Sequence, residues 1–581
     1  MLGEDGLGIG EVRDRARDFQ NAVVGAGAEI QLGHRHSHHA IGGFIELAKA
    51  LDEVGGHAGV TARLAMPGKA VALDFAGFFH APADGRGGLA GDVAALRVSF
   101  ALDAGHVSLR IVSVRAFHEM IQPVRHVHFL GICGSAMGAV AAAMREQGFE
   151  VTGSDEKMFP PMSDFLRERG IALKEGYAAK NIPDHTDLVV VGNVIGRGNP
   201  ELEEVLNRRL PYQSLPETLR HYFLRGRRNL VVAGTHGKTT TAALLTHILR
   251  TNGLNPAYMI GGIADDLGQG ASLHDSEIVV IEGDEYDTAF FDKGPKFAHY
   301  LPDLAILNAV ELDQMDIYPN LAAVKKAFGL LMRVLPENGV LIFNADDPNS
   351  CEVAAQSRTK TKFAVGLGET ATVRATEIHH DPAASHFTLL GAKYSVPMVG
   401  EIYVRNAAMA IIAAHHCGVP ADVMQRAVSG FRGVRRRQVL RGERNGIRIV
   451  EDFGKHPTNI RETIKAMRHR FPGARVWAAV DPRSNTMCRA AIQEALTDAL
   501  AHADGALISS VDRPERFAPG EALDPAGMAR ALAARGVVAF AEAGPDGIVA
   551  RLRELARPGD VAVLFSSGSF GGIYETLLRE L

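Results

Sequence analysis

The sequence predicts an α/β protein in which several parallel sheets follow one another along the chain. From about residue 126 onward, short apolar runs alternate with longer segments of helical period, which is the pattern of βαβ units. The 581 residues suffice for three or four domains of about 150 residues each. With 46% hydrophobic and 22% charged residues, the composition is that of a globular protein. We therefore expect α/β layers in series.

The expected strands coincide with the apolar runs. These runs are residues 126–130, 188–191, 230–233, 278–281, 304–307, 340–343, 476–480 and 561–565. Helices are expected over residues 136–147, 239–252, 407–417 and 458–470. Each of these segments begins beside a glycine, a cap residue or a turn, as helices commonly do.

Residues 1–125 follow a different pattern and form an expected N-terminal extension. Residues 96–102 alternate apolar and polar side chains, residues 103–105 read as a turn, and the alternation resumes at Val107. This pattern predicts a hairpin in a small antiparallel domain. The histidine-rich run at 34–39 could bind a metal, although a solvated loop is the simpler interpretation.

Charge and cysteine content exclude several classes of protein. The formal net charge of -5 creates no field that would attract polyanions, so we expect no nucleic-acid partner. The four cysteines contain no CxxC pair, which argues against a disulfide framework. The N-terminus lacks the basic and apolar pattern of an export signal, and glycines interrupt the longest apolar stretch, residues 127–144. We expect a cytoplasmic protein without membrane insertion.

The most informative segment is the apolar run ending at Ala233 that continues as GTHGKTT, residues 234–240. An apolar strand that leads through glycines into a helix is a phosphate cradle, because amides at the helix N-terminus point at anionic oxygens. Lys238 would supply charge to the β- and γ-phosphates, and the Thr239 hydroxyl would reach Mg²⁺. Val232 stands where the general phosphate-loop pattern has its first glycine. The alternative is a glycine turn that only packs.

Carboxylates follow the apolar run 278–281 in the sequence EGDEYD, residues 282–287. The carboxyl end of a parallel strand is where α/β sheets hold ligands, so we expect a second group directed at Mg²⁺ there. Glu282 is the residue we select. A solvated acidic loop is the alternative.

A second glycine loop follows the first expected strand and contains Gly131, Gly134 and Gly138. It is similar to a dinucleotide-fold phosphate turn, and Asp155 follows about twenty residues later, where a ribose or base contact is usual. A redox enzyme would need only one of the two nucleotide-like sites, which would leave the phosphate loop without a purpose.

Over residues 126–581 the sequence resembles the Mur ligase family, the ATP-dependent amide-forming enzymes of peptidoglycan synthesis. GTHGKTT at 234–240 looks like the ATP loop, NADDP at 344–348 like the central-domain signature, and FRGVRRR at 431–437 like the arginine motif before the C-terminal domain. The resemblance implies a Rossmann-like UDP-sugar domain at 126–225, a P-loop ATPase domain at 226–430 and a Rossmann-like peptide-binding domain at 431–581. It also implies ATP, Mg²⁺ and an acyl phosphate.

The resemblance assigns site residues. The expected catalytic residues are Lys238, Glu282, Arg436 and Asp452. The ATP site comprises Gly234, Thr235, His236, Gly237, Lys238, Thr239, Thr240, Asn406, Arg436 and Arg437, and the Mg²⁺ site comprises Thr239, Glu282 and Gln314. UDP-N-acetylmuramate is assigned to Gly131, Gly134, Ser135, Gly138, Ser154, Asp155 and Asn193, and the peptide to Arg483, Ser484 and Asn485.

Two segments select a branch of the family. Residues 282–293 and the DPRSNTM run at 481–487 look most like the members that attach the tripeptide L-Ala-γ-D-Glu-meso-diaminopimelate to UDP-N-acetylmuramate in recycling. The alternative branch attaches L-alanine. The planar guanidinium of Arg483 suits a peptide carboxylate, and the side-chain amide of Asn485 can both donate and accept hydrogen bonds. A capped turn is the purely structural explanation of this run.

Three places depart from the family pattern. Gln314 stands where the family has histidine, Ile402 and Tyr403 replace a His-Asn pair near adenine, and Lys455 replaces another histidine. These changes allow a working ligase with an altered ATP site or a chain that binds UDP-N-acetylmuramate without catalysis. We favour the enzyme because Lys238, Glu282 and the other assigned groups are retained.

Overall fold

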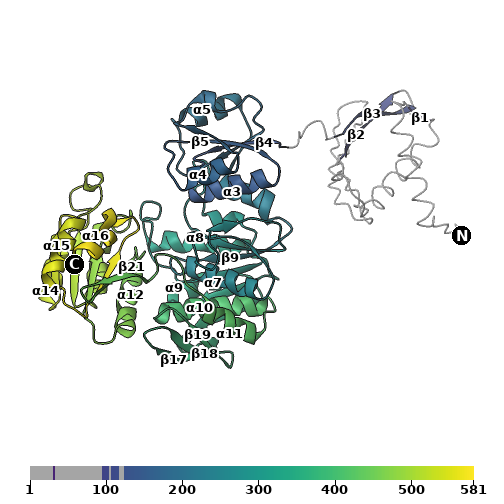
Figure 1. The fold of residues 1–581 in the computed structure, drawn as a ribbon. Coiled ribbons are helices and arrows are strands. Elements are labelled where there is room, and N and C mark those ends of the chain that lie inside the picture. Colours follow the sequence, from purple (N-terminus) through teal and green to yellow (C-terminus); the bar gives the residue numbers. More distant parts are fainter. Residues whose placement is uncertain (1–29, 33–93, 104–105, 117–123) are drawn as a thin grey trace. The chain divides into compact units, whose positions relative to one another are not determined.

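The computed structural model describes residues 30–32, 94–103, 106–116 and 124–581, which belong to two compact units, residues 1–124 and 125–581 (Figure 1). The described strands of the first unit form an antiparallel sheet in the order β1-β3-β2. They are β1 (Ile30–Leu32), β2 (Ala94–Asp103) and β3 (His106–Ala116). The two strands of the expected hairpin are confirmed, whereas its tip at 104–105 and the histidine run at 34–39 lie outside the described residues.

The second unit begins with a five-stranded parallel sheet in the order β6-β5-β4-β7-β8. Its strands are β4 (His126–Leu130), β5 (Glu150–Asp155), β6 (Ala172–Glu175), β7 (Leu188–Val191) and β8 (Tyr212–Ser214), and its helices are α3 (Ser135–Glu146), α4 (Met162–Glu168) and α5 (Pro200–Arg208). All residues of β4 and β7 are buried, as expected for central strands of a parallel sheet. The strand order reverses between β4 and β7, and such switch points are where open α/β sheets hold ligands.

The next sheet has eight strands in the order β11-β10-β12-β9-β13-β14-β15-β16, parallel except for the β10–β11 pair. The strands are β9 (Arg228–Ala233), β10 (Ala257–Met259), β11 (Ala271–Ser272), β12 (Ile278–Gly283), β13 (Leu304–Leu307), β14 (Val340–Asn344), β15 (Thr361–Gly366) and β16 (Val373–Arg374). The helices are α7 (Lys238–Thr251), α8 (Leu321–Val334), α9 (Pro348–Ala355), α10 (Glu401–His416) and α11 (Ala421–Gly430), whereas α6 (Leu215–Leu219) follows β8 and contacts β7 and β8 of the first sheet. Because β9 lies between β12 and β13, the loops that follow these three strands share one edge of the sheet.

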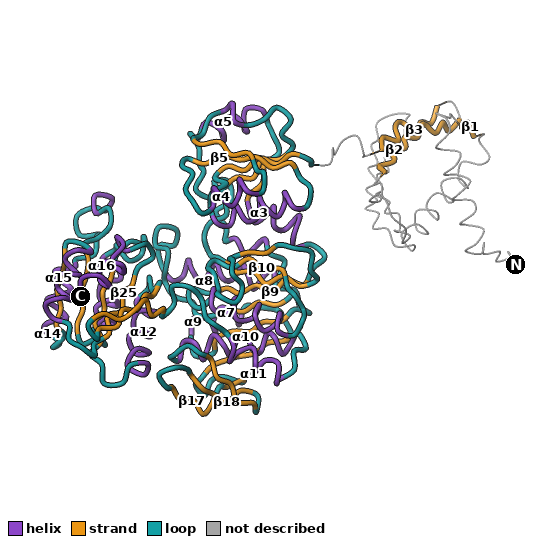
Figure 2. Tube along the Cα trace, in the orientation of Figure 1, coloured by secondary structure: helices purple, strands orange, loops and turns teal. Residues whose placement is uncertain are grey.

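A small antiparallel sheet precedes α10 in the chain. It consists of β17 (Thr376–His380), β18 (Ser385–Leu389) and β19 (Ala392–Val396) in that order. Figure 2 shows these strands next to the helices of the central sheet, and Phe387 and Tyr394 belong to the same apolar core as α7 and α10.

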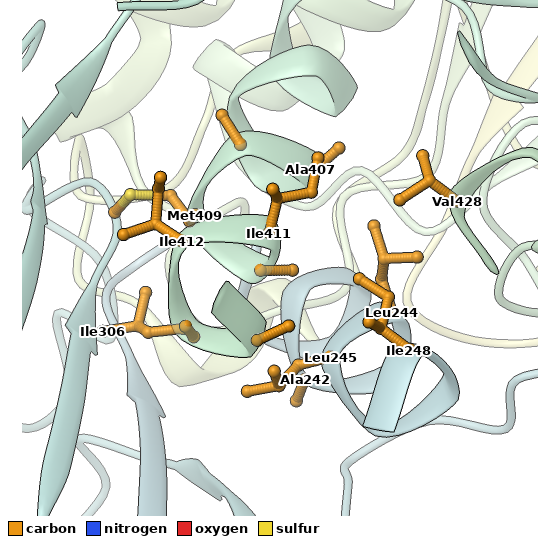
Figure 3. Packing of buried hydrophobic residues seen from close by; sticks show 14 of the residues in the cluster. Ala242, Leu244, Leu245, Ile248, Ile306, Ala407, Met409, Ile411, Ile412 and Val428 are labelled. Atoms are coloured by element: carbon orange, nitrogen blue, oxygen red, sulfur yellow. The ribbon is translucent and has the colours of Figure 1, made fainter. Parts of the chain in front are cut away.

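One face of the central sheet packs against α7, α10 and α11 (Figure 3). Leu230 and Val232, two residues apart on β9, belong to this core, since alternate side chains of a strand point to the same face. Leu245 of α7 and Ile411 of α10 are fully buried in it. This packing holds the N-terminus of α7 against the carboxyl end of β9.

The last sheet has six strands in the order β20-β21-β25-β22-β23-β24, parallel except for the β20–β21 pair. Its strands are β20 (Val439–Arg444), β21 (Ile447–Asp452), β22 (Val476–Val480), β23 (Gly505–Ser509), β24 (Val538–Glu542) and β25 (Val561–Phe565). The helices are α12 (Pro457–Arg470), α13 (Gln493–Leu500), α14 (Pro525–Ala534), α15 (Pro545–Leu555) and α16 (Ile573–Glu580). Apolar clusters cover both faces of this sheet.

The α/β fold class is confirmed, and every expected strand from residue 126 onward is present. The helix expected over 407–417 starts earlier, at Glu401, because Gly400 with φ 120° supplies the turn that begins it. The apolar run from Ala407 marks only the buried middle of that helix. Among the described residues, none of the helices combines the length and the apolarity needed to cross a bilayer.

Replacing Leu245 by alanine should lower the free energy of unfolding by about 2–5 kcal/mol, because the deletion leaves a cavity in the core of the central sheet. Leu254, just after α7 and 37% exposed, provides a matched control, and Leu254→Ala should change stability by no more than about 0.5 kcal/mol. Urea unfolding of both variants measures the difference. Equal losses would contradict the assigned packing.

Candidate functional site

The turn between β9 and α7 is shaped for an anion. Gly234 and Gly237 have φ values of 122° and 78°, a region that favours glycine. A Cβ on Gly234 would come within 2.8 Å of the Asn308 Cβ, so the turn also lacks room for a side chain. Within the described residues no side chain caps α7, and its first backbone amides are therefore available to a phosphate.

Lys238, the first residue of α7, is buried beside this turn. Its Nζ donates to the Gly234 carbonyl at 2.7 Å and to the Glu285 carboxylate at 2.8 Å. Burial opposes the charge, but the carboxylates, led by Glu285, hold the pKa of Lys238 above its usual value. The ammonium therefore remains charged at the N-terminus of the helix.

Oxygen atoms surround Lys238. The Thr239 hydroxyl donates to Glu282 at 3.0 Å, and Gln314 Nε2 donates to Glu285 at 2.5 Å. Gln314 Oε1 is buried and has no hydrogen-bond partner among the described residues. Burial and the charge of Asp284 raise the pKa of Glu282.

This oxygen set fits a hard divalent cation. Carboxylate, hydroxyl and amide oxygens are the ligands that Mg²⁺ prefers, and the unsatisfied Gln314 oxygen would gain a partner. The predicted metal residues Thr239, Glu282 and Gln314 are thus gathered in one place, around Lys238 and Glu285. Glu285 itself was not selected from the sequence, although it belongs to the same EGDEYD run.

Other predicted nucleotide residues lie next to the turn. Asn406 on α10 contacts it so closely that a Cβ on Gly237 would collide with the Asn406 Oδ1. His236 Nε2 hydrogen-bonds to the Glu311 carboxylate at 2.9 Å, and the Thr235 hydroxyl donates to the Glu311 carbonyl at 3.1 Å. Thr240 is buried in the first turn of α7.

Arg436, Arg437 and Asp452 lie where the chain enters the last sheet. Arg436 donates to Glu451 at 2.8 Å and to the Ser566 carbonyl at 2.9 Å. Asp452 accepts from the amides of Gln438 and Gly454 at 3.0 and 2.8 Å. The Arg437 guanidinium lies 4.9 Å from the Phe453 ring. In this structure Arg436 and Asp452 therefore hold the backbone around the start of the last sheet.

The second glycine loop follows β4 at the switch point of the first sheet. Gly131 has φ 82°, and its amide donates to the Ser154 carbonyl at 2.8 Å. Asp155 accepts from the Cys133 amide at 2.8 Å and so positions the loop. Gly134 and Ser135 begin α3, and Gly138 lies against Met162.

Two further residues assigned to UDP-N-acetylmuramate, Asn193 and Ser154, differ in their surroundings. Asn193 follows β7 and is exposed at the same edge of the sheet. The Ser154 hydroxyl instead donates to the buried carboxylate of Glu201 inside the domain.

Arg483 lines a hollow of about 600 Å³ in the last sheet's domain. The other lining residues are Asp512, Arg513, Ser567, Gly568 and Ser569. Ser484 and Asn485 are not part of this lining: Ser484 Oγ accepts from the Met487 amide, and Asn485 donates to Asp316 at 2.8 Å. Arg513 and the serines were missed because they lie far from the PRSNT run in sequence.

Three family models match consecutive parts of the chain. They are the Mur ligase family catalytic domain at residues 126–227, the Mur ligase middle domain at 232–414 and the Mur ligase glutamate ligase domain at 435–568. The chain belongs to the Mur ligase family. It is thus an ATP-dependent amide-forming ligase with the three-domain architecture of that family and an N-terminal extension.

Relatives of the chain within the Mur ligase family include two named peptide ligases. The UDP-N-acetylmuramate–L-alanyl-γ-D-glutamyl-meso-2,6-diaminoheptandioate ligase of Escherichia coli is 40% identical over 460 residues, which cover 78% of this chain and 98% of the relative. The crystal structure of a murein peptide ligase from Psychrobacter arcticus is 32% identical with a TM-score of 0.58, over 78% of this chain and 98% of that one. A UDP-N-acetylmuramate–L-alanine ligase of Nitrosospira multiformis is 33% identical over 79% of this chain and 95% of the relative.

The structure shows the surroundings of Lys455 and Tyr403, two of the residues that depart from the Mur ligase pattern. Lys455 Nζ donates to the Tyr286 hydroxyl at 3.2 Å and lies 3.8 Å from Asp313. Burial alone would lower the pKa of Lys455, but Asp313 and Tyr286 raise it, so the charge persists. Tyr403 is buried on α10, which raises its pKa and leaves no imidazole or amide at that position.

Replacing Thr239 by valine should weaken binding of ADP with Mg²⁺ about 10- to 100-fold, because a hydroxyl near a charged site contributes about 1.5–3 kcal/mol. Thr246→Val is the matched control, since among the described residues the Thr246 hydroxyl bonds only to the Ala242 carbonyl within α7. Calorimetric titration measures both variants. Unchanged binding by Thr239→Val would show that the hydroxyl does not serve the cation.

Proposed function

We propose that this Mur ligase uses ATP to join L-Ala-γ-D-Glu-meso-diaminopimelate to UDP-N-acetylmuramate in peptidoglycan recycling. The observation that carries the proposal is the 40% identity to the Escherichia coli ligase of that name, extending over 98% of that enzyme. The Psychrobacter arcticus peptide ligase supports it with a similar coverage. The residues around the phosphate loop support the chemistry.

We assign the sugar nucleotide to residues 126–225, ATP to 226–430 and the peptide to 431–581. The carboxylate of UDP-N-acetylmuramate becomes an effective electrophile once ATP has phosphorylated one of its oxygens, a step that releases ADP. The tripeptide amine then attacks the acyl phosphate and displaces phosphate to form the amide. Mg²⁺ bound at Thr239, Glu282 and Gln314 would supply charge neutralisation for the phosphates. Lys238 and the first amides of α7 bind and orient those phosphates.

The hollow that contains Arg483 and Arg513 suits the tripeptide better than L-alanine. The tripeptide carries three carboxylates, two of them on its diaminopimelate end, whereas L-alanine carries one. Both guanidiniums neighbour Asp512, at 3.8 and 2.8 Å, and each keeps further N–H donors for a ligand. Ser567 and Ser569 add hydroxyl groups to the same hollow.

Purified protein with ATP, Mg²⁺ and UDP-N-acetylmuramate should give an amide product with the tripeptide, detected by mass spectrometry, and none with L-alanine. Lys238→Ala should abolish the product while leaving UDP-N-acetylmuramate binding nearly intact, because Lys238 lies beside the phosphate turn and outside the first sheet. Product from L-alanine alone would place the chain in the L-alanine branch. UDP-N-acetylmuramate binding without any product would indicate a sugar-nucleotide binder.

Replacing Arg513 by alanine should raise the KM for the tripeptide about 10- to 100-fold and leave the KM for UDP-N-acetylmuramate unchanged, because a charged hydrogen bond contributes about 1.5–3 kcal/mol. Arg530→Ala removes an exposed arginine of the same domain, 3.6 Å from Asp524 and outside the hollow, and serves as the control. Steady-state kinetics with each substrate varied separate the two effects. Equal KM values for Arg513→Ala and the control would remove the hollow from the peptide site.

A further inference from the structure

Two histidines and a glutamate converge beside the phosphate turn, apart from the oxygen set around Lys238. Glu311 Oε2 lies 2.9 Å from His236 Nε2 and 3.2 Å from His456 Nδ1. The three ligand atoms lie within 4.8 Å of one another, and the two imidazole centroids are 4.5 Å apart. A tetrahedral zinc site needs ligand atoms about 3.3 Å apart, so small side-chain adjustments would admit an ion.

The hydrogen bonds of His456 determine which of its nitrogens carries the proton. Its Nε2 lies 3.2 Å from the Leu312 carbonyl, which can only accept, so Nε2 carries the proton. Nδ1 therefore carries the lone pair, which accepts from the Thr458 amide at 3.3 Å while Nδ1 also lies 3.2 Å from Glu311 Oε2. A histidine whose second nitrogen donates to a backbone carbonyl is also the usual arrangement of a metal ligand.

The surroundings hold Glu311 in place. The Thr458 hydroxyl donates to Glu311 Oε2 at 2.7 Å, and the Glu311 amide donates to Thr235 Oγ1 at 3.0 Å. His236 and His456 are buried, whereas the Glu311 side chain is 30% exposed and leaves a side open to solvent.

We propose that His236, Glu311 and His456 form a second metal site, specific for a borderline transition metal such as Zn²⁺, that joins the phosphate turn to helix α12. Two imidazoles and one carboxylate with an open position are a zinc-type ligand set, whereas Mg²⁺ prefers oxygen ligands. His236 lies in the turn after β9, Glu311 in the loop after β13, and His456 is the N-cap of α12. A bound ion therefore restrains three separate segments at once.

The test is Zn²⁺ titration of the full chain against a competing chelator in excess Mg²⁺. Wild type should bind Zn²⁺ at least about 100-fold more tightly than His456→Gln or Glu311→Gln, each of which removes a ligand, and about 10-fold more tightly than Thr458→Val, which keeps all three ligands. Thr458→Val keeps the test decisive if a ligand variant fails to fold. The wild type and all the variants retain the histidines at 34–39, so Zn²⁺ bound there adds equally to every titration.

His185→Gln provides the matched control. It removes a ligand from the other described His/Glu group, His126, Glu150 and His185, and should leave the tight Zn²⁺ binding unchanged. Hydrogen exchange should slow on Zn²⁺ addition in both residues 234–240 and α12 of the wild type, and in neither segment of His456→Gln. Equal Zn²⁺ affinity in wild type, His456→Gln and Glu311→Gln would overturn the proposal, as would slower exchange in only one segment. Neither readout requires ligase activity, so the result is independent of the proposed function.

Discussion

The buried ion pair between Lys238 and Glu285 is the interaction on which the site depends. The two side chains are 10% and 3% exposed, so each charge has lost most of its water. Removing one partner of such a pair typically costs about 3–5 kcal/mol, because the other charge is left uncompensated. Glu285 also accepts from Gln314, and its backbone carbonyl accepts from the Tyr318 hydroxyl, so the pair is connected to the loop after β13.

Residues that differ from the Mur ligase pattern lie around the same pair. Gln314 donates to Glu285 through its nitrogen, and its buried Oε1, which has no hydrogen-bond partner among the described residues, is left available to a cation. Lys455, which follows β21, places a positive charge near Asp313. Both changes preserve the charge pattern of the site, whereas buried Tyr403 replaces a polar contact with packing.

The position of β9 in its sheet brings the residues of the candidate site together. Parallel strands β12 and β13 flank β9, and an isolated bridge between His236 and Ala309 joins the loops that follow β9 and β13. The phosphate turn, the oxygen set around Lys238 and the His236–Glu311 pair all lie at this one edge of the sheet. Contacts from the segment after β21, through Lys455 and His456, reach the same edge and link the last domain to the nucleotide site.

The sequence by itself determined the strands and the glycine turns, and it selected Lys238, Thr239 and Glu282 for the phosphate turn and its cation, because periodicity and turn chemistry act within a few consecutive residues. It also placed a hairpin in the first 125 residues, where β2 and β3 pair. Only the tertiary structure decided that Glu285 pairs with Lys238, that the Ser154 hydroxyl faces Glu201, and that Arg513 shares a hollow with Arg483. Those partners lie tens of residues apart, and the order and packing of the strands, which no local pattern encodes, bring them together.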